Sequence, residues 1–175
     1  MRLLISLSVI IISALTAGAQ SLIDNLPRER PDIDSIYSEI TDRTSPYYYP
    51  RLMEEFERND TTMKLDKYRR LYLGAMLSED YDAYRPSAYQ AADPSALLNR
   101  AMLTRAECDT VIKYSSAALA DNPFDLVQMI NLSRALRARG RTSLADIWNY
   151  KVRLLLMAIL STGTASYTFY IILLQ

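Results

Sequence analysis

Apolar residues recur at helical spacing along most of the chain, which predicts a series of short amphipathic helices. The pattern begins at Pro31 and continues in a helix opened by Pro50, in one over residues 65–77, and in a short one after Asp93-Pro94. In the first helix the apolar residues follow the i, i+3, i+4, i+7 rule of a single helix face: Ile33, Ile36, Tyr37 and Ile40. The fold class predicted is all-α, with about seven short helices arranged in antiparallel hairpins.

Residues 104–164 carry the clearest punctuation between predicted helices. Thr104 and Glu107 have the spacing of a capping box, in which each side chain satisfies a free backbone amide of the first turn. Asn122-Pro123 predicts the start of the next helix, as an acceptor followed by a residue that needs no amide donor. Gly140 suits the left-handed position that ends this helix, and Ser143 then opens a third.

The spacing in this segment resembles a tetratricopeptide-type unit of about 34 residues. With Pro123 at the proline of that unit, several residues match the pattern, in which small side chains allow two antiparallel helices to approach closely: Ala118, Leu132, Gly140 and Ala145. Other consensus positions are occupied by residues that do not match: Met129, Ser133, Leu136 and Asn149. Two interpretations therefore fit the C-terminal part, a tetratricopeptide-like arrangement and an unrelated helical hairpin with the same punctuation.

Composition narrows the chemistry that is open to the chain. The 20 basic and 20 acidic residues balance, so there is no basic footprint of the kind that nucleic acid binding requires. Histidine is absent and Cys108 is the only cysteine, which excludes an internal disulfide, a Cys/His zinc site and a Cys–His nucleophile. We assign no catalytic, cofactor-binding or metal-binding residue, and we expect no cofactor.

The first 19 residues have the pattern of a cleavable export signal. A positive start at Met1-Arg2 precedes an apolar run over residues 3–15, and Ala17-Gly18-Ala19 matches the A-x-A cleavage site. The apolar run is too short for an ordinary membrane span. We therefore expect an exported protein, periplasmic or secreted, that has no stable membrane span once the signal is removed at Gln20.

Beyond the signal, the sequence divides into three further parts. Residues 20–30 form a polar, flexible lead-in, and residues 31–164 a single α-helical domain. Residues 165–175 form an atypical tail, for which we expect a frameshifted or truncated end.

Three segments resemble a family of exported proteins from Bacteroidetes that is known only as a domain of unknown function: YYYPRLM (47–53), NDTTM (59–63) and YRRLYLG (68–74). The resemblance covers residues 33–164 and implies an α-helical secreted protein with no known activity, substrate or cofactor. Lys64 departs from the family pattern, because it stands where relatives tend to carry a helix-capping threonine. The tail after Thr164 has no family pattern.

Tyrosine is the most unusual component of the sequence, with 13 residues. Flat rings with a polar tip are favoured in grooves that bind a peptide or a glycan. The candidate binding residues are Tyr47, Tyr48, Tyr49, Arg51, Tyr68, Tyr72, Tyr81 and Tyr84. The alternative is that these tyrosines lie at the edge of the core, because some of them fall on predicted apolar helix stripes.

The first functional hypothesis is an exported, non-enzymatic module that binds another envelope or secreted protein; the sequence does not specify an oligomeric state. The second is a carboxylate-dependent hydrolase that uses residues near Asp60 or Asp80. Asp60 is followed by Thr61 and Thr62, which is more typical of a cap than of a catalytic acid. The third is a non-functional, truncated member of the family.

Overall fold

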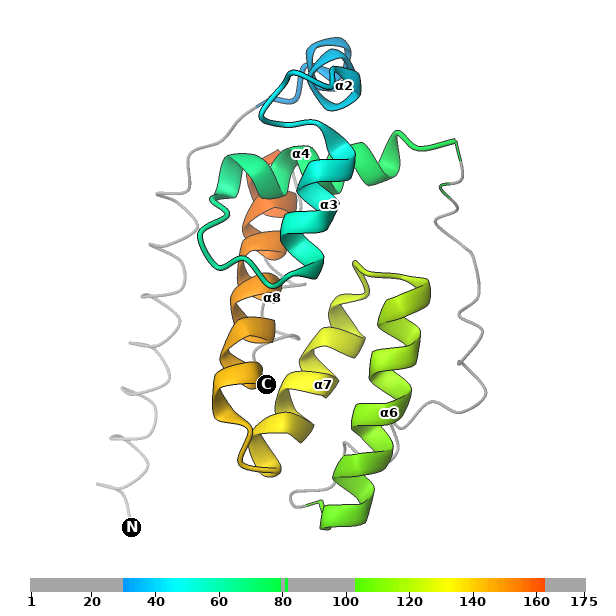
Figure 1. The fold of residues 1–175 in the computed structure, drawn as a ribbon, viewed down its shortest axis with the longest axis vertical. Coiled ribbons are helices and arrows are strands. Elements are labelled where there is room, and N and C mark those ends of the chain that lie inside the picture. The colour runs from blue at the N-terminus through cyan, green and yellow to red at the C-terminus, as the bar shows by residue number, and fades with distance from the viewer. Residues whose placement is uncertain (1–29, 80, 82–102, 163–175) are drawn as a thin grey trace, which may run out of the picture. The chain divides into compact units, whose positions relative to one another are not determined.

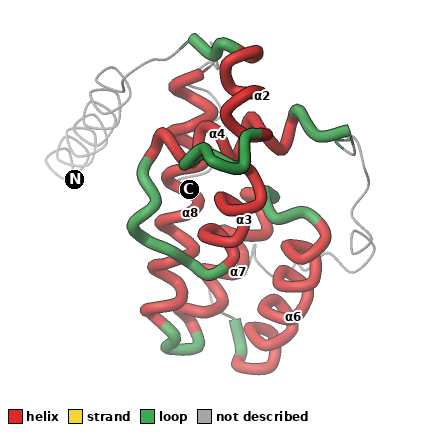
Figure 2. Tube along the Cα trace, turned by 45° about the horizontal axis from the view of Figure 1, so that its top comes forward, coloured by secondary structure: helices red, strands yellow, loops and turns green. Residues whose placement is uncertain are grey.

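The computed structural model describes residues 30–79, 81 and 103–162, and all regular secondary structure in these residues is helical (Figures 1 and 2). The helices are α2 (Ile33–Thr41), α3 (Tyr49–Glu57), α4 (Leu65–Met76), α6 (Arg105–Asp121), α7 (Leu126–Ala138) and α8 (Thr142–Thr162). This confirms the all-α fold class.

The chain divides into two compact units. The larger, Asp32–Ala158, holds α2, α3, α4, α6, α7 and most of α8. Of the other unit, Met1–Pro31 with Ile159–Gln175, the described residues are 30, 31 and 159–162. Several expectations fall outside the described residues: the signal over 1–19, the lead-in up to residue 29, the helix after Asp93-Pro94 and the tail 165–175.

The starts of the first three helices follow from local chemistry. The side chain of Asp32 caps α2 by accepting a hydrogen bond from the Ser35 amide at 3.3 Å. The helix therefore begins at Ile33, two residues after the expected start at Pro31. Pro50 lies in the first turn of α3, as predicted, where its missing amide costs nothing. Lys64 precedes α4 and provides no side-chain cap, as expected for a lysine in place of a helix-capping threonine.

Two punctuation signals of the C-terminal helices are confirmed. The capping box of α6 is complete: the Glu107 amide donates to Thr104 Oγ1 at 3.3 Å, and the Thr104 amide donates to Glu107 Oε2 at 2.8 Å. Gly140 has a φ of 77°, which favours glycine. Its amide donates to Arg137 O and the Arg141 amide donates to Leu136 O, both at 2.9 Å. These two bonds end α7 as a Schellman motif.

The predicted start of α7 at Asn122-Pro123 is wrong by three residues. Asn122 instead follows the last residue of α6, and its side chain accepts a hydrogen bond from the Phe124 amide at 3.2 Å. The cap of α7 is Asp125, which accepts from the Gln128 amide at 3.0 Å. Both residues are good caps by themselves. The turn between them lets Phe124 pack against the core, and that long-range contact decides which one starts the helix.

The start of α8 also differs from the prediction. The helix begins at Thr142, so Ser143 lies inside its first turn rather than before it. Asp146, three residues after Ser143, pairs instead with the Arg137 side chain of α7. An interhelical ion pair therefore replaces the expected local cap.

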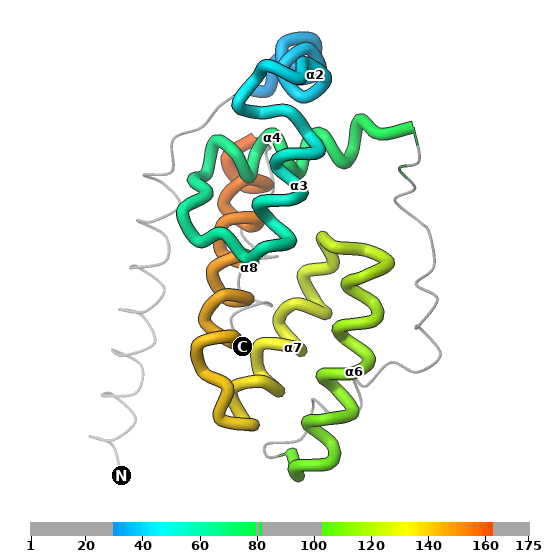
Figure 3. Tube along the Cα trace, viewed as in Figure 1, coloured from blue at the N-terminus to red at the C-terminus, as the bar shows by residue number. Residues whose placement is uncertain are grey.

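The last three helices form two successive hairpins, with α6 antiparallel to α7 and α7 antiparallel to α8 (Figure 3). At the second hairpin the Ser133 hydroxyl lies 3.0 Å from Ala145 O and 2.7 Å from Asn149 Oδ1, so the two helices approach closely. Ala145 itself is fully buried. The antiparallel hairpins are as expected, whereas the tetratricopeptide-like register stays a prediction.

The core of the larger unit joins residues far apart in sequence. Tyr150 of α8 packs edge-on against Tyr68 of α4, with ring centroids 6.4 Å apart, and its hydroxyl donates to Met63 O at 2.8 Å. The fully buried side chains around this contact come from α3, α4, α7, α8 and the segment between α3 and α4: Leu52, Met63, Tyr68, Leu71, Met129 and Leu155.

We expect Tyr150→Phe to lower the free energy of unfolding by about 1 kcal/mol, because the ring packing is kept while the hydrogen bond to the Met63 carbonyl is lost. Urea denaturation followed by circular dichroism measures this. Tyr114→Phe on α6 is the matched control, since the Tyr114 hydroxyl has no hydrogen bond to the described residues. Equal stability of the two variants would show that the Tyr150 bond contributes nothing.

Candidate functional site

The tyrosine segment that leads into α3 is tied into the fold by specific contacts. Tyr47 donates a hydrogen bond to Asp66 Oδ2 at 2.9 Å, and this bond raises the pKa of the Tyr47 hydroxyl. The Arg70 guanidinium lies 4.8 Å from the centre of the Tyr47 ring and also pairs with Glu39 at 2.9 Å. Tyr47 therefore helps to join α2 and α4 through one polar cluster.

Tyr49 fills the space above a glycine of α4. A Cβ atom added to Gly74 would lie 2.8 Å from Tyr49 Cδ2, which is closer than real side-chain contacts allow. Burial raises the pKa of the Tyr49 hydroxyl, as expected for a ring that is half-covered by neighbouring helices. Glycine at residue 74 is thus required by the close approach of this ring.

The remaining candidate binding residues occupy different environments. Tyr68 is a core residue, only 1% exposed, and burial raises its pKa strongly. Tyr72 is half-buried and packs edge-on against Phe124, and Tyr48 is also half-buried. Tyr81 is exposed, and Tyr84 lies outside the described residues. Arg51 donates hydrogen bonds to the carbonyls of Ser45 and Arg43 at 2.9 and 3.2 Å, so it holds the loop before α3.

Asp60 forms a turn and does not cap a helix. Its Oδ1 accepts from the Thr62 amide at 2.8 Å and from the Thr62 hydroxyl at 2.7 Å. These bonds lower the pKa of the Asp60 carboxyl, whereas a general acid requires a raised pKa. The helix that follows begins after Lys64, so the predicted cap is in fact a side-chain turn. Asp80, the other proposed acid, lies outside the described residues.

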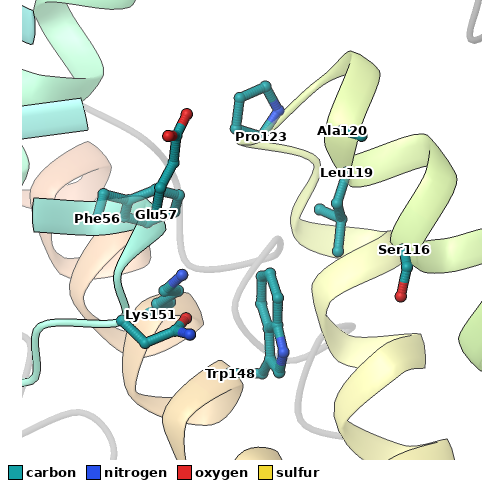
Figure 4. Close-up of a pocket in the computed structure, with 9 residues that line it drawn as sticks. Phe56, Glu57, Ser116, Leu119, Ala120, Pro123, Trp148 and Lys151 are labelled. Carbon is teal, nitrogen blue, oxygen red and sulfur yellow. The ribbon is translucent and has the colours of Figure 1, made fainter. Parts of the chain in front are cut away.

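A pocket of about 420 Å³ lies among α3, α6, the turn after α6, and α8 (Figure 4). This volume is typical of sites that hold small molecules or an anchoring side chain of a partner. Most of the residues that line it are apolar: Phe56, Leu119, Ala120, Pro123 and Trp148. The polar residues of the lining are Glu57, Asn59, Ser116 and Lys151. Lys151 and Trp148 face Leu119 and Pro123 across the pocket (Figure 4).

Lys151 is the unusual residue of this pocket. Its side chain is 3% exposed, and its Nζ lies 4.1 Å from the centre of the Phe56 ring and 4.5 Å from the centre of the Trp148 ring. Ring faces attract a cation at this distance. No carboxylate of the described residues pairs with it. Burial lowers the pKa of Lys151 to about 8, against the opposing effect of Glu57.

Sequence reasoning missed Lys151. The apolar stripe of the last helix includes Trp148 and Leu155, and Lys151 stands three residues after the first and four before the second. A charged residue at this spacing points into the packed face of the helix. The position of Lys151 on the apolar stripe is therefore visible in the sequence, although the tyrosine-rich composition and the acidic residues suggested other candidate sites.

The chemistry that this pocket offers is the binding of a negatively charged group by the buried ammonium of Lys151. The described residues bring no three Cys, Asp or Glu side chains together in a way that would hold a metal ion.

Within the part of the chain that the structure describes, no helix is both long enough and apolar enough to cross a bilayer.

A comparison with protein families finds a match to the family described as Domain of unknown function (DUF4919) over residues 34–174. The chain belongs to this family. Lys151 and the whole pocket lie inside the matched range, which also includes residues 165–174 of the tail. Searches of curated proteins and of solved structures found no match.

We expect Lys151→Met to raise the free energy of unfolding near pH 7 by about 1–3 kcal/mol, because it removes a buried cation that has no carboxylate partner and keeps a similar volume. The sign of the pH dependence follows from the pKa of Lys151, which is about 8 when folded and 10.5 ordinarily. Between these values the unfolded chain binds more protons, so folding of the wild type gains stability as pH rises. The advantage of the variant should therefore shrink from pH 8 towards 10.5.

Denaturant titrations of both proteins across this pH range measure the difference. Lys113→Met is the control, because Lys113 is exposed on α6 and its replacement should change stability by less than about 0.5 kcal/mol at each pH. A Lys151→Met protein that is less stable than the wild type at neutral pH would contradict the expectation.

Proposed function

We propose that the protein is an exported, non-enzymatic helical module that binds another envelope or secreted protein, and that the Lys151 pocket is the centre of the contact. Export is supported by the pattern of residues 1–19, with its positive start, apolar run and A-x-A site. Binding is supported by the pocket, which is lined by side chains from α3, α6 and α8.

One observation carries the proposal: Lys151 is buried between Phe56 and Trp148 at an accessible pocket and has no carboxylate partner among the described residues. A buried, unpaired charge costs folding free energy. Any partner group that pairs with it in the complex recovers part of this cost, so the arrangement favours the bound state. Aromatic residues that flank a pocket are also frequent energetic centres of interfaces.

The hydrolase alternative has less support from the described residues. Of its two proposed acids, Asp60 holds Thr62 in a turn, and its lowered pKa opposes proton donation. Glu57, at the end of α3, is the only carboxylate among the residues that line the pocket. Glycoside hydrolysis would require a second carboxylate across the site.

The test is a crosslinking capture from an envelope and secreted-protein extract, with residues 20–175 as bait, in wild-type, Lys151→Met and Lys113→Met forms. We expect one partner that wild type and Lys113→Met capture equally, that free wild-type protein competes away, and that Lys151→Met captures at least about tenfold less. The loss has a physical reason, since the variant removes the only positively charged side chain among those that line the pocket.

Two results would contradict the proposal. Equal capture by Lys151→Met would show that the pocket is not part of the interface. If no bait captured a competable partner, the proposed interaction itself would be wrong. A cooperative thermal melt of each bait is required first. A broad, non-cooperative melt would instead favour the third hypothesis, a non-functional truncated protein.

A further inference from the structure

We infer that the Lys151 pocket is a binding site for a small organic acid, a monocarboxylate borne on a compact apolar body. The inference rests on the proposed function in one respect, since such an acid and the partner protein would compete for the same pocket. Direct binding to the isolated protein, however, is a separate property of the site.

The charge of the ligand follows from the charges that line the pocket. Lys151 provides one ammonium group without a carboxylate partner among the described residues, and a negative ligand group would pair with it in a poorly hydrated environment. Glu57 is the other charged residue among those lining the pocket. Its carboxylate repels a second negative charge, so a monoanion is favoured over a phosphate dianion. Asn59 and Ser116 are left as neutral hydrogen-bonding groups for the same ligand.

The body of the ligand follows from the walls. Phe56, Leu119, Pro123 and Trp148 are apolar or aromatic, and they surround a volume of about 420 Å³. Such walls favour an apolar group that displaces water, with one polar group for orientation. A carboxylate alone would leave most of this surface in contact with water. The acid and the apolar body are therefore required together.

Trp148 makes the inference directly measurable. It is the only tryptophan of the chain, it lines the pocket, and Lys151 Nζ lies 4.5 Å from its ring centre. A ligand that pairs with Lys151 changes the surroundings of this ring. Intrinsic fluorescence therefore reports on pocket occupancy, with isothermal titration calorimetry as an independent readout.

The experiment titrates residues 20–175 with cyclohexylacetate, with the neutral isostere cyclohexylacetamide and with acetate. We expect cyclohexylacetate to bind at least about tenfold more tightly than either comparison ligand, because only it carries both the charge and the apolar body. In Lys151→Met the acid and the amide should bind equally weakly. In Glu57→Gln the acid should bind more tightly, and in Lys113→Met as in wild type.

Each other outcome overturns the inference in a defined way. Equal binding of acid and amide would show an apolar pocket without acid recognition, and equal binding of acetate would show a simple anion site. No binding of any ligand to a protein that melts cooperatively would remove the ligand site. None of these results affects capture of a protein partner, so failure here is distinguishable from failure of the proposed function.

Discussion

The contacts of one ring, Phe56, join α3 to α4, to α8 and to the turn after α6. It packs edge-on against Tyr68 of α4 at 6.0 Å and lies 5.5 Å from Phe124 in the turn after α6. The ammonium of Lys151, from α8, lies over the same ring. Helices this short are only marginally stable by themselves, so their stability comes from such packing rather than from local propensity. Phe56 at 3% exposure thus couples three distant parts of the chain.

The pocket is a direct consequence of this coupling. Phe56 belongs to both the core cluster and the pocket wall, and Trp148 and Leu119 also pack against the cluster on one side and line the pocket on the other. The pocket wall and the core therefore share side chains. Lys151 is held by two rings that favour its charge and by a burial that disfavours it. The pKa of Lys151 is lowered because burial outweighs the opposing charge of Glu57.

The parts of the fold that sequence could predict are those with local causes. The capping box at Thr104 and the glycine at residue 140 each depend on residues within one or two helical turns, and both are as expected. The start of α7 could not be predicted, because Asn122 and Asp125 are both capable caps and the choice depends on where Phe124 packs. Capping preferences alone do not choose between two such residues when a contact with a distant part of the chain decides where the helix begins.

The candidate site follows the same division. The composition suggested a binding surface made of tyrosines. However, Tyr68 lies in the core and Tyr47 donates a hydrogen bond to Asp66. The abundance of tyrosine therefore did not indicate a shared surface. The position of Lys151 on an apolar stripe was visible in the sequence, but its neighbours Phe56 and Leu119 were not, because they come from other helices. A lysine on such a stripe can extend along the apolar surface to water or end at a pocket. Only the packing of α3 and α6 around α8 distinguishes these cases, and here it places the charge at a pocket.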